Sequence, residues 1–271
     1  MLPDGYRVTL EHQGSHWWYR TRRALFMRQV RRAARTLEPG AARHGRRLAL
    51  LDYGCAAGFE LGALAELGTA EGADIVDAGE AAGSAGVLAP LASAGTPVHL
   101  VPRDLPGLRA RFDIVTCLDV LEHLDDDVAG LRTLASLLTP GGQVVVTVPA
   151  YPWLWSGEDV ISQHRRRYTR RRLLGACRAA GLEILFASYF NLGILPAMAA
   201  VVWWRRLTHA GWRTESNLAA AGEARWLRGL HALAGGIAAV EARAVGDEWL
   251  SLPAGASVLC RLRRRPAGAD A

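Results

Sequence analysis

The sequence predicts an α/β fold built on a doubly wound parallel sheet. Segments rich in aliphatic residues alternate with segments of helical periodicity along most of the 271 residues, which is the pattern of a parallel sheet covered by helices on both faces. Residues 112–118 are largely apolar, as expected for a strand that is buried on both sides. About half of the residues are apolar, enough for one large domain or for one domain with a cap.

The helices and strands follow from the periodicity of apolar residues, in chain order. A first amphipathic helix over 16–38 is expected to end at Pro39-Gly40, because both residues interrupt helices. The tetrapeptide TPGG at 139–142 is expected to turn the chain into the next strand. Strands are expected at 48–52, 70–75, 97–101, 112–118, 143–149, 182–190 and 256–262, with further helices at 59–67, 126–138, 169–180 and 225–245.

The charge of the chain leaves its partners open. The formal net charge is +6, and the basic residues gather at 20–35, 165–172 and 261–265. Such clusters occur on phosphate-binding surfaces, but solvated helix faces produce them too. Every basic residue is an arginine, which is more typical of coding bias than of phosphate contact. No RNA-recognition or zinc-finger signature is present in the sequence, so a nucleic-acid partner is not expected.

The cysteines and the apolar segments predict a cytoplasmic protein. Cys55, Cys117, Cys177 and Cys260 are scattered without a CxxC pair, so we expect buried thiols and neither a disulfide framework nor a metal site. The first residues lack the features of a secretory signal, and no apolar run is long enough to predict a membrane-spanning helix.

The stretch LALLDYGCAAGFELGAL, residues 48–64, predicts a strand, a tight turn and a helix. Ligands of parallel sheets bind at such a turn, beyond the carboxyl ends of the strands. Alanines at 56 and 57 break the G-x-G-x-x-G spacing that a dinucleotide pyrophosphate needs, and no P-loop motif is present in the sequence. The turn therefore predicts a ligand that needs no phosphate-binding loop.

The turn DYGCAAG resembles the first turn of the class I S-adenosylmethionine-dependent methyltransferases, which commonly reads D-x-G-C-G-x-G. An acidic residue beside this turn suits a ligand that carries a sulfonium and an ammonium group. The stretches HWWYRTRR, FDIVTCLDVLEHL, HRRRYT and LPAGASVLCRLRR resemble one broad bacterial subgroup of these enzymes, whose substrates are often unassigned. The resemblance covers most of the chain except 76–96 and 208–224.

The resemblance implies a fold and a division into domains. It implies a Rossmann-like, seven-stranded sheet with an antiparallel last strand. Residues 1–47 would form a helical lid, residues 48–190 and 254–265 the core, and residues 191–253 a helical cap over the substrate. We expect S-adenosylmethionine as the cofactor. The residues implied to bind it are Asp52, Gly54, Cys55, Gly58, Asp74, Ile75, Asp104 and Asp119, with Asp74 on the ribose hydroxyls and Asp104 near the adenine. Asp74 could instead be an ordinary loop aspartate.

Two histidines are candidate catalytic residues, since a hydroxyl acceptor must lose its proton during methyl transfer. His164 has two carboxylates nearby in sequence that could orient its imidazole, although it could equally be a structural loop histidine. His123 follows the fourth strand and could instead cap a helix. The aromatic residues Tyr151, Trp155 and Tyr168 could line an acceptor pocket or form the core of the cap.

The leading interpretation is a methyltransferase for a small-molecule, glycan or lipid-linked acceptor in a bacterial biosynthetic pathway. A protein that keeps the fold as a binding scaffold, and an isomerase or cyclase that uses the sulfonium without transferring methyl, remain open. An RNA methyltransferase is supported by the arginines alone. A homodimer and a peripheral membrane contact through residues 192–207, where Trp203-Trp204 precede Arg205-Arg206, are further expectations.

Overall fold

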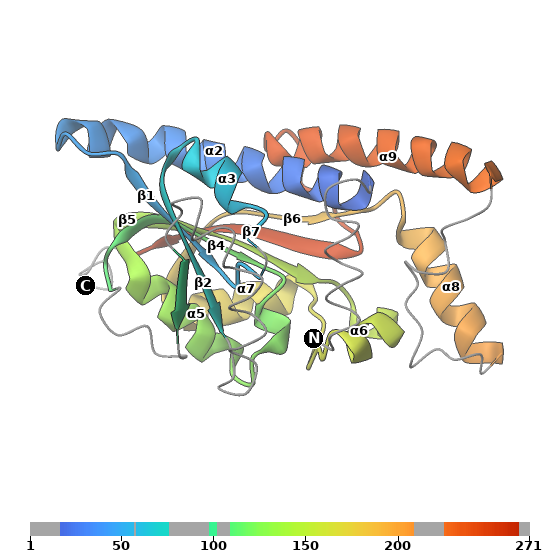
Figure 1. Cartoon of the computed structure of the whole chain (residues 1–271). Helices are drawn as coiled ribbons and strands as arrows, with labels where there is room; N and C mark the ends of the chain where they lie inside the picture. Colours follow the sequence, from blue (N-terminus) through green and yellow to red (C-terminus); the bar gives the residue numbers. More distant parts are fainter. Residues whose placement is uncertain (1–16, 57, 76–97, 102–108, 209–224, 266–271) are drawn as a thin grey trace.

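The protein is an α/β sandwich around a single mixed sheet (Figure 1). The computed structural model describes residues 17–56, 58–75, 98–101, 109–208 and 225–265. The sheet has seven strands in the order β3-β2-β1-β4-β5-β7-β6. Strands β1 to β5 pair in parallel, and β7 runs antiparallel to both of its neighbours. The predicted α/β fold with a parallel core is confirmed.

The strands and helices follow one another in the alternating order that the sequence predicts. The strands are β1 Leu48–Tyr53, β2 Gly68–Ile75, β3 Val98–Val101, β4 Phe112–Leu118, β5 Leu138–Pro149, β6 Leu182–Phe190 and β7 Ser257–Arg264. The α-helices are α2 Trp17–Arg43, α3 Leu61–Ala65, α5 Asp127–Leu137, α6 Gly157–Ile161, α7 Arg170–Ala179, α8 Leu195–Thr208 and α9 Arg225–Gly246. Two short 3-10 turns, η1 Leu121–His123 and η2 Pro152–Leu154, follow β4 and β5. No helix in this described part of the chain has the length and apolar character needed to cross a membrane.

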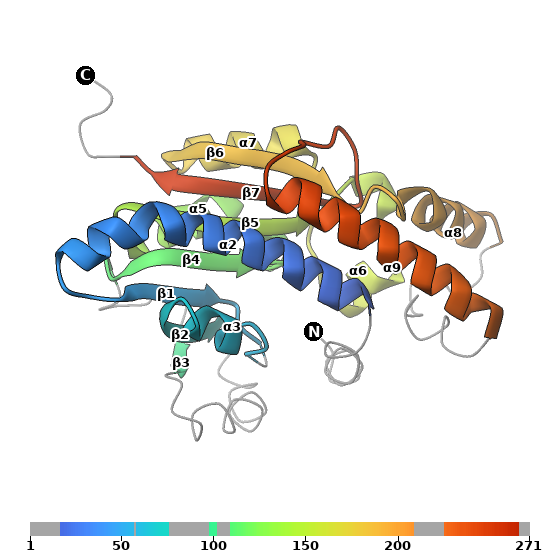
Figure 2. The same cartoon turned by 90° about the horizontal axis from the view of Figure 1, so that it is seen from above.

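Helices cover both faces of the sheet. Helices α2 and α9 lie side by side on one face, and α5 and α7 lie on the other (Figures 1 and 2). The central strands are buried from both sides, with β4 and β5 nearly free of solvent contact along their length. This double burial explains their aliphatic sequences, because no face of these strands meets water.

The expected lid and the expected cap are packed against each other. Arg28 of α2 donates two hydrogen bonds to Asp247, at 2.9 and 2.8 Å, and buried Gln29 donates to the carbonyl of Gly246 at 3.0 Å. Helix α9 therefore belongs to the layer that covers the sheet. Helix α8 stands away from the sheet beside α6 (Figure 1), with only Val202 among its buried residues.

Two local predictions were wrong. Helix α2 continues through Pro39 to Arg43 and gives way to Gly45, whose φ is +63°. Buried Ala41 packs into the core beyond the proline, and this packing outweighs the backbone hydrogen bond that proline cannot make. The residues TPGG lie within β5, where the pairing with β4 shifts after Phe112 and the chain stays extended.

Candidate functional site

The turn after β1 lies at the point where the strand order of the sheet reverses. Strand β1 pairs with β2 on one side and with β4 on the other. The backbone amides of Gly54 and Cys55 both donate to the carbonyl of Ala73 on β2, at 2.7 and 3.1 Å, and the Gly58 amide donates to the Cys55 carbonyl at 2.7 Å. These bonds hold the turn at the carboxyl edge of the sheet, where parallel α/β proteins bind their ligands.

The backbone of this turn is left-handed at three positions. The φ angles are +83° at Gly54, +44° at Ala56 and +72° at Gly58. A Cβ atom on Gly54 would lie 2.3 Å from Cγ2 of Val120, so only glycine fits there. Ala56 keeps the backbone conformation that glycine favours, in spite of its methyl group. Ala57 lies outside the described residues.

The remaining residues predicted to bind the cofactor flank this turn. Asp52 is buried, and its Oδ1 accepts a hydrogen bond from the Thr116 hydroxyl at 2.7 Å. Cys55 is buried beside Gly72. Asp74 and Ile75 end β2, one and two residues beyond the carbonyl that anchors the turn. Asp104 lies outside the described residues.

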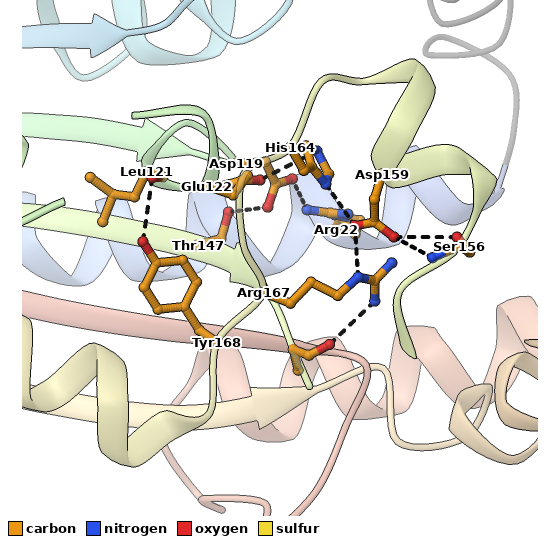
Figure 3. A network of polar contacts seen from close by, with 11 residues as sticks. Arg22, Asp119, Leu121, Glu122, Thr147, Ser156, Asp159, His164, Arg167 and Tyr168 are labelled. Carbon is orange, nitrogen blue, oxygen red and sulfur yellow. Dashed lines mark hydrogen bonds and ion pairs between the residues drawn. The ribbon is translucent and has the colours of Figure 1, made fainter. Parts of the chain in front are cut away.

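Asp119 connects this edge of the sheet to helix α2. It follows β4 with a φ of +56°, forms an ion pair with Arg22, and accepts a hydrogen bond from the Thr147 hydroxyl at 3.1 Å (Figure 3). The Arg22 guanidinium also lies over the rings of Phe26 and Phe190, at 5.4 and 5.6 Å from their centroids. The Asp119 carboxylate is thereby bound to protein groups at the carboxyl ends of β4 and β5.

His164 is fixed by a buried carboxylate. Its Nδ1 lies 2.8 Å from Oδ1 of Asp159 and, because an ionised carboxylate only accepts, Nδ1 carries the proton. Asp159 also accepts from Arg167 Nε and from the Ser156 amide, both at 2.7 Å (Figure 3). Burial alone would raise the pKa of Asp159, but the hydrogen bonds from His164 and Arg167 outweigh it and hold the pKa below its usual value. The expected orientation of His164 by a nearby carboxylate is present.

Glu122 and His123 face His164 from the turn η1. Oε1 of Glu122 lies 3.9 Å from Nε2 of His164, and the two imidazole rings are edge to face with centroids 4.8 Å apart. Burial and the neighbouring Asp119 raise the pKa of Glu122 well above its ordinary value. Burial and the neighbouring His164 lower the pKa of His123 to about 4. Glu122 is a functional candidate that we did not predict, although its position directly before His123 on one turn is visible in the sequence.

The arginines of the HRRRY segment bind internal acceptors. Arg165 pairs with Asp125 at 2.6 Å, and its amide donates to the Glu122 carbonyl at 2.8 Å. Arg166 donates to the Asp125 carbonyl at 2.7 Å. These bonds clamp the loop that carries His164 onto η1. With Arg167, which binds Asp159, three of the arginines at 165–172 are thus part of the site's scaffold.

The three aromatic residues predicted to line an acceptor pocket lie in different surroundings. Tyr168 is fully buried, and its hydroxyl donates to Asp127 at 2.9 Å. Its prediction as a substrate contact was wrong, because the tight packing of the core leaves no room for an acceptor beside the ring. Tyr151 is half-buried and stacks between the rings of Trp153 and Tyr189. Trp155 is half-buried, and its carbonyl accepts from Arg206 of α8 at 3.1 Å.

The turn and the histidine pair belong to one site. Val120 packs over Gly54, and residues 121–123 follow it directly. The carboxyl ends of β1, β4 and β5 thus bring a glycine-like turn beside two imidazoles and a buried carboxylate.

Comparison with known proteins points to one family. The profile of a family described as "Methyltransferase domain" matches residues 17–186. A ubiquinone biosynthesis O-methyltransferase of Azotobacter vinelandii is 33% identical over 154 residues, which cover 50% of this chain and 64% of that protein. The protein of the same name from Marinobacter nauticus is 36% identical over 105 residues, which cover 36% of this chain and 42% of that protein. The chain therefore spans less than two thirds of the length of these relatives.

Solved structures resemble the chain only distantly. The S-adenosylmethionine-dependent methyltransferase from Mesorhizobium loti has a TM-score of 0.47 and 16% sequence identity, with 81% of this chain and 92% of that chain covered.

Proposed function

Because the chain belongs to the methyltransferase domain family, we propose that it transfers a methyl group from S-adenosylmethionine to a small-molecule, glycan or lipid-linked acceptor in a bacterial biosynthetic pathway. The relatives are named as O-methyltransferases of ubiquinone biosynthesis, which favours a hydroxyl oxygen as the methylated atom. The acceptor of this chain is part of the proposal.

The left-handed turn from Gly54 to Gly58 carries this proposal. A turn with φ values of +83°, +44° and +72° at the end of β1 leaves backbone, and few side-chain atoms, toward the ligand edge of the sheet. In our proposal the carboxylate of Asp52 favours the positively charged end of the ligand. Asp74, at the end of β2, accepts hydrogen bonds from the two ribose hydroxyls, since one carboxylate offers two acceptor oxygens.

We propose that the histidine pair activates the acceptor. The acceptor oxygen attacks the methyl carbon in line with the bond to sulfur, the new C–O bond forms, and the electron pair of the broken C–S bond stays on sulfur as S-adenosylhomocysteine. The hydroxyl proton passes to Nε2 of His164, because Nδ1 of that ring already donates to Asp159. His123, whose ring packs edge to face on His164, positions the ring that takes the proton.

Calorimetry tests the cofactor site directly. Wild-type protein is titrated with S-adenosylmethionine and S-adenosylhomocysteine, and the titration is repeated with Asp74→Ala. Glu66→Ala is the control, because this exposed carboxylate pairs only with Arg31 at the surface, at 3.6 Å. We expect micromolar binding that Asp74→Ala weakens at least tenfold, equal to about 1.4 kcal/mol, and Glu66→Ala leaves unchanged. A wild-type chain that binds neither ligand contradicts the proposal and favours the binding-scaffold alternative, for which the methyl group of Ala56 is the supporting observation.

We further propose that α8 contacts an anionic membrane surface, where a lipid-linked acceptor would lie. Trp203, Trp204 and Leu207 are exposed on this helix, and Arg205 and Arg206 follow the two tryptophans. Tryptophan rings favour the region of the lipid headgroups, and arginines favour anionic lipids. A second copy of the chain is the alternative occupant of this surface, and the size of the protein in solution distinguishes the two.

A further inference from the structure

The carboxylate of Glu122 has no hydrogen-bond partner among the described residues. The side chain is fully buried, and both of its oxygens are unsatisfied. A buried polar group without a partner costs about 1–3 kcal/mol, and more if it is charged, so native proteins rarely keep one without a ligand, water or ion beside it. The two oxygens of Glu122 therefore indicate something that binds there.

Two imidazole nitrogens face the same space. One ligand atom each from Glu122, His123 and His164 lies within 4.8 Å of the other two. Both histidines are partly exposed, while the carboxylate is buried below them, so the cluster is open to solvent on one side. Three donor atoms that converge in this way, with one open side, match the arrangement of a metal site that keeps a free coordination position.

The hydrogen bonds around His164 are those of a metal-ligand histidine. Its Nδ1–H donates to Asp159, which leaves the lone pair of Nε2 directed toward Glu122. Asp159 is held in turn by Arg167 and by the Ser156 amide. A carboxylate that orients a histidine from behind is the usual support of such a ligand, because it fixes the ring and increases the basicity of the free nitrogen.

We propose that Glu122, His123 and His164 bind a divalent transition-metal ion of the zinc class. Bonds of about 2.0–2.1 Å place neighbouring tetrahedral ligand atoms about 3.4 Å apart. The 3.9 Å between Glu122 Oε1 and His164 Nε2 needs to close by only about half an ångström. Two imidazoles select zinc, cobalt or iron over magnesium or calcium, which prefer oxygen ligands. Asp119 is not part of the set, because its carboxylate is bound by Arg22 and Thr147.

The use of the ion rests on the proposed function, whereas the site itself does not. A bound cation in this position lowers the pKa of a hydroxyl that coordinates to it. His164 then holds the ion in place of taking the proton, and Asp159 keeps the same role behind the ring. Acceptors with an oxygen free to enter the open side of the cluster, such as phenols and vicinal diols, are the class that this arrangement favours.

Cobalt(II) tests the site without any methyl acceptor. Chelator-treated full-length protein is titrated with Co²⁺ alone, and its visible absorption reports nitrogen and oxygen ligands. We expect one equivalent to bind, to be displaced by Zn²⁺, and to resist Mg²⁺. Glu122→Gln keeps the shape of the side chain and should weaken binding at least tenfold, and Asp159→Asn should weaken it about 10–100-fold. His44→Ala is the matched control, because His44 is an exposed histidine on the far end of α2.

Each outcome decides the proposal. It is overturned if no absorbing one-to-one complex forms, if Glu122→Gln binds Co²⁺ as the wild type does, or if Mg²⁺ displaces Co²⁺ as readily as Zn²⁺ does. Binding that disappears in His44→Ala assigns the metal to the surface and also overturns it. Calorimetry with S-adenosylhomocysteine on the same samples verifies that each variant is folded. Protein that binds the nucleoside but no cobalt refutes the metal site alone, and protein that binds cobalt but no nucleoside refutes the proposed function alone.

Discussion

Replacing Gly54 by alanine should damage the turn by two separable effects. The first is conformational, because φ at this residue is +83°, and a left-handed backbone costs an L-residue about 1–2 kcal/mol. The second is steric, because the new Cβ would lie 2.3 Å from Cγ2 and 3.3 Å from Cγ1 of Val120. Rotation of the valine only exchanges one methyl for the other, since its χ1 is restricted. Overpacking of this kind costs about 1–3 kcal/mol, so we expect a total loss of about 2–5 kcal/mol.

Gly181→Ala separates these two effects. Gly181 has a φ of +77°, and no atom lies within 4 Å of the point that a Cβ would occupy there, so this variant should lose only the conformational part, about 1–2 kcal/mol. The free energy of unfolding is measured in urea for both variants, and the affinity for S-adenosylhomocysteine by calorimetry. Gly54→Ala should also lose nucleoside binding, and the added change Val120→Ala should restore part of the lost stability. Equal losses in the two single variants, with nucleoside binding intact in Gly54→Ala, would refute the steric argument.

Three further predictions concern other parts of the molecule. Ala56→Gly should raise the free energy of unfolding by about 1 kcal/mol, because glycine adopts the φ of +44° without a steric penalty; a loss in urea unfolding would contradict this. Burial alone would raise the pKa of Asp113, but the Arg46 hydrogen bonds, with those from Ala49 and Thr139, hold it below its ordinary value. A carboxyl with a lowered folded-state pKa stabilises the protein above its unfolded pKa of about 3.9 and loses this contribution as the pH falls through the folded value. Asp113→Asn should therefore be less stable than the wild type by about 1–3 kcal/mol at pH 7, and the difference should vanish in acid; a difference that persists below both pKa values would count against the ion pair. Trp204→Ala should weaken sedimentation with phosphatidylglycerol vesicles several-fold, whereas Trp249→Ala, which removes an equally exposed ring (68% for each), should not; equal effects would argue against a specific contact through α8.

The candidate site was only partly predictable, because different residues depend on different information. The turn is visible in the sequence since Asp52, Gly54 and Gly58 are close neighbours whose spacing alone indicates a tight bend. The pairing of Arg22 with Asp119 joins residues 97 positions apart, and no local pattern relates them. Glu122 escaped notice for a similar reason. Its unsatisfied oxygens become evident only when the loop carrying His164 is folded back on η1 by arginine hydrogen bonds that span about 40 residues.

The sequence by itself determined the alternation of strands and helices, the doubly covered parallel sheet and the position of the ligand turn. These features follow from the periodicity of apolar side chains and from glycine spacing, which act over a few residues. The tertiary structure alone decided that α2 runs on through Pro39, that α9 packs beside α2, and that two histidines meet a buried carboxylate. Such contacts depend on which surfaces the sheet brings together, and the free energy of burying them outweighs the local preferences of the chain.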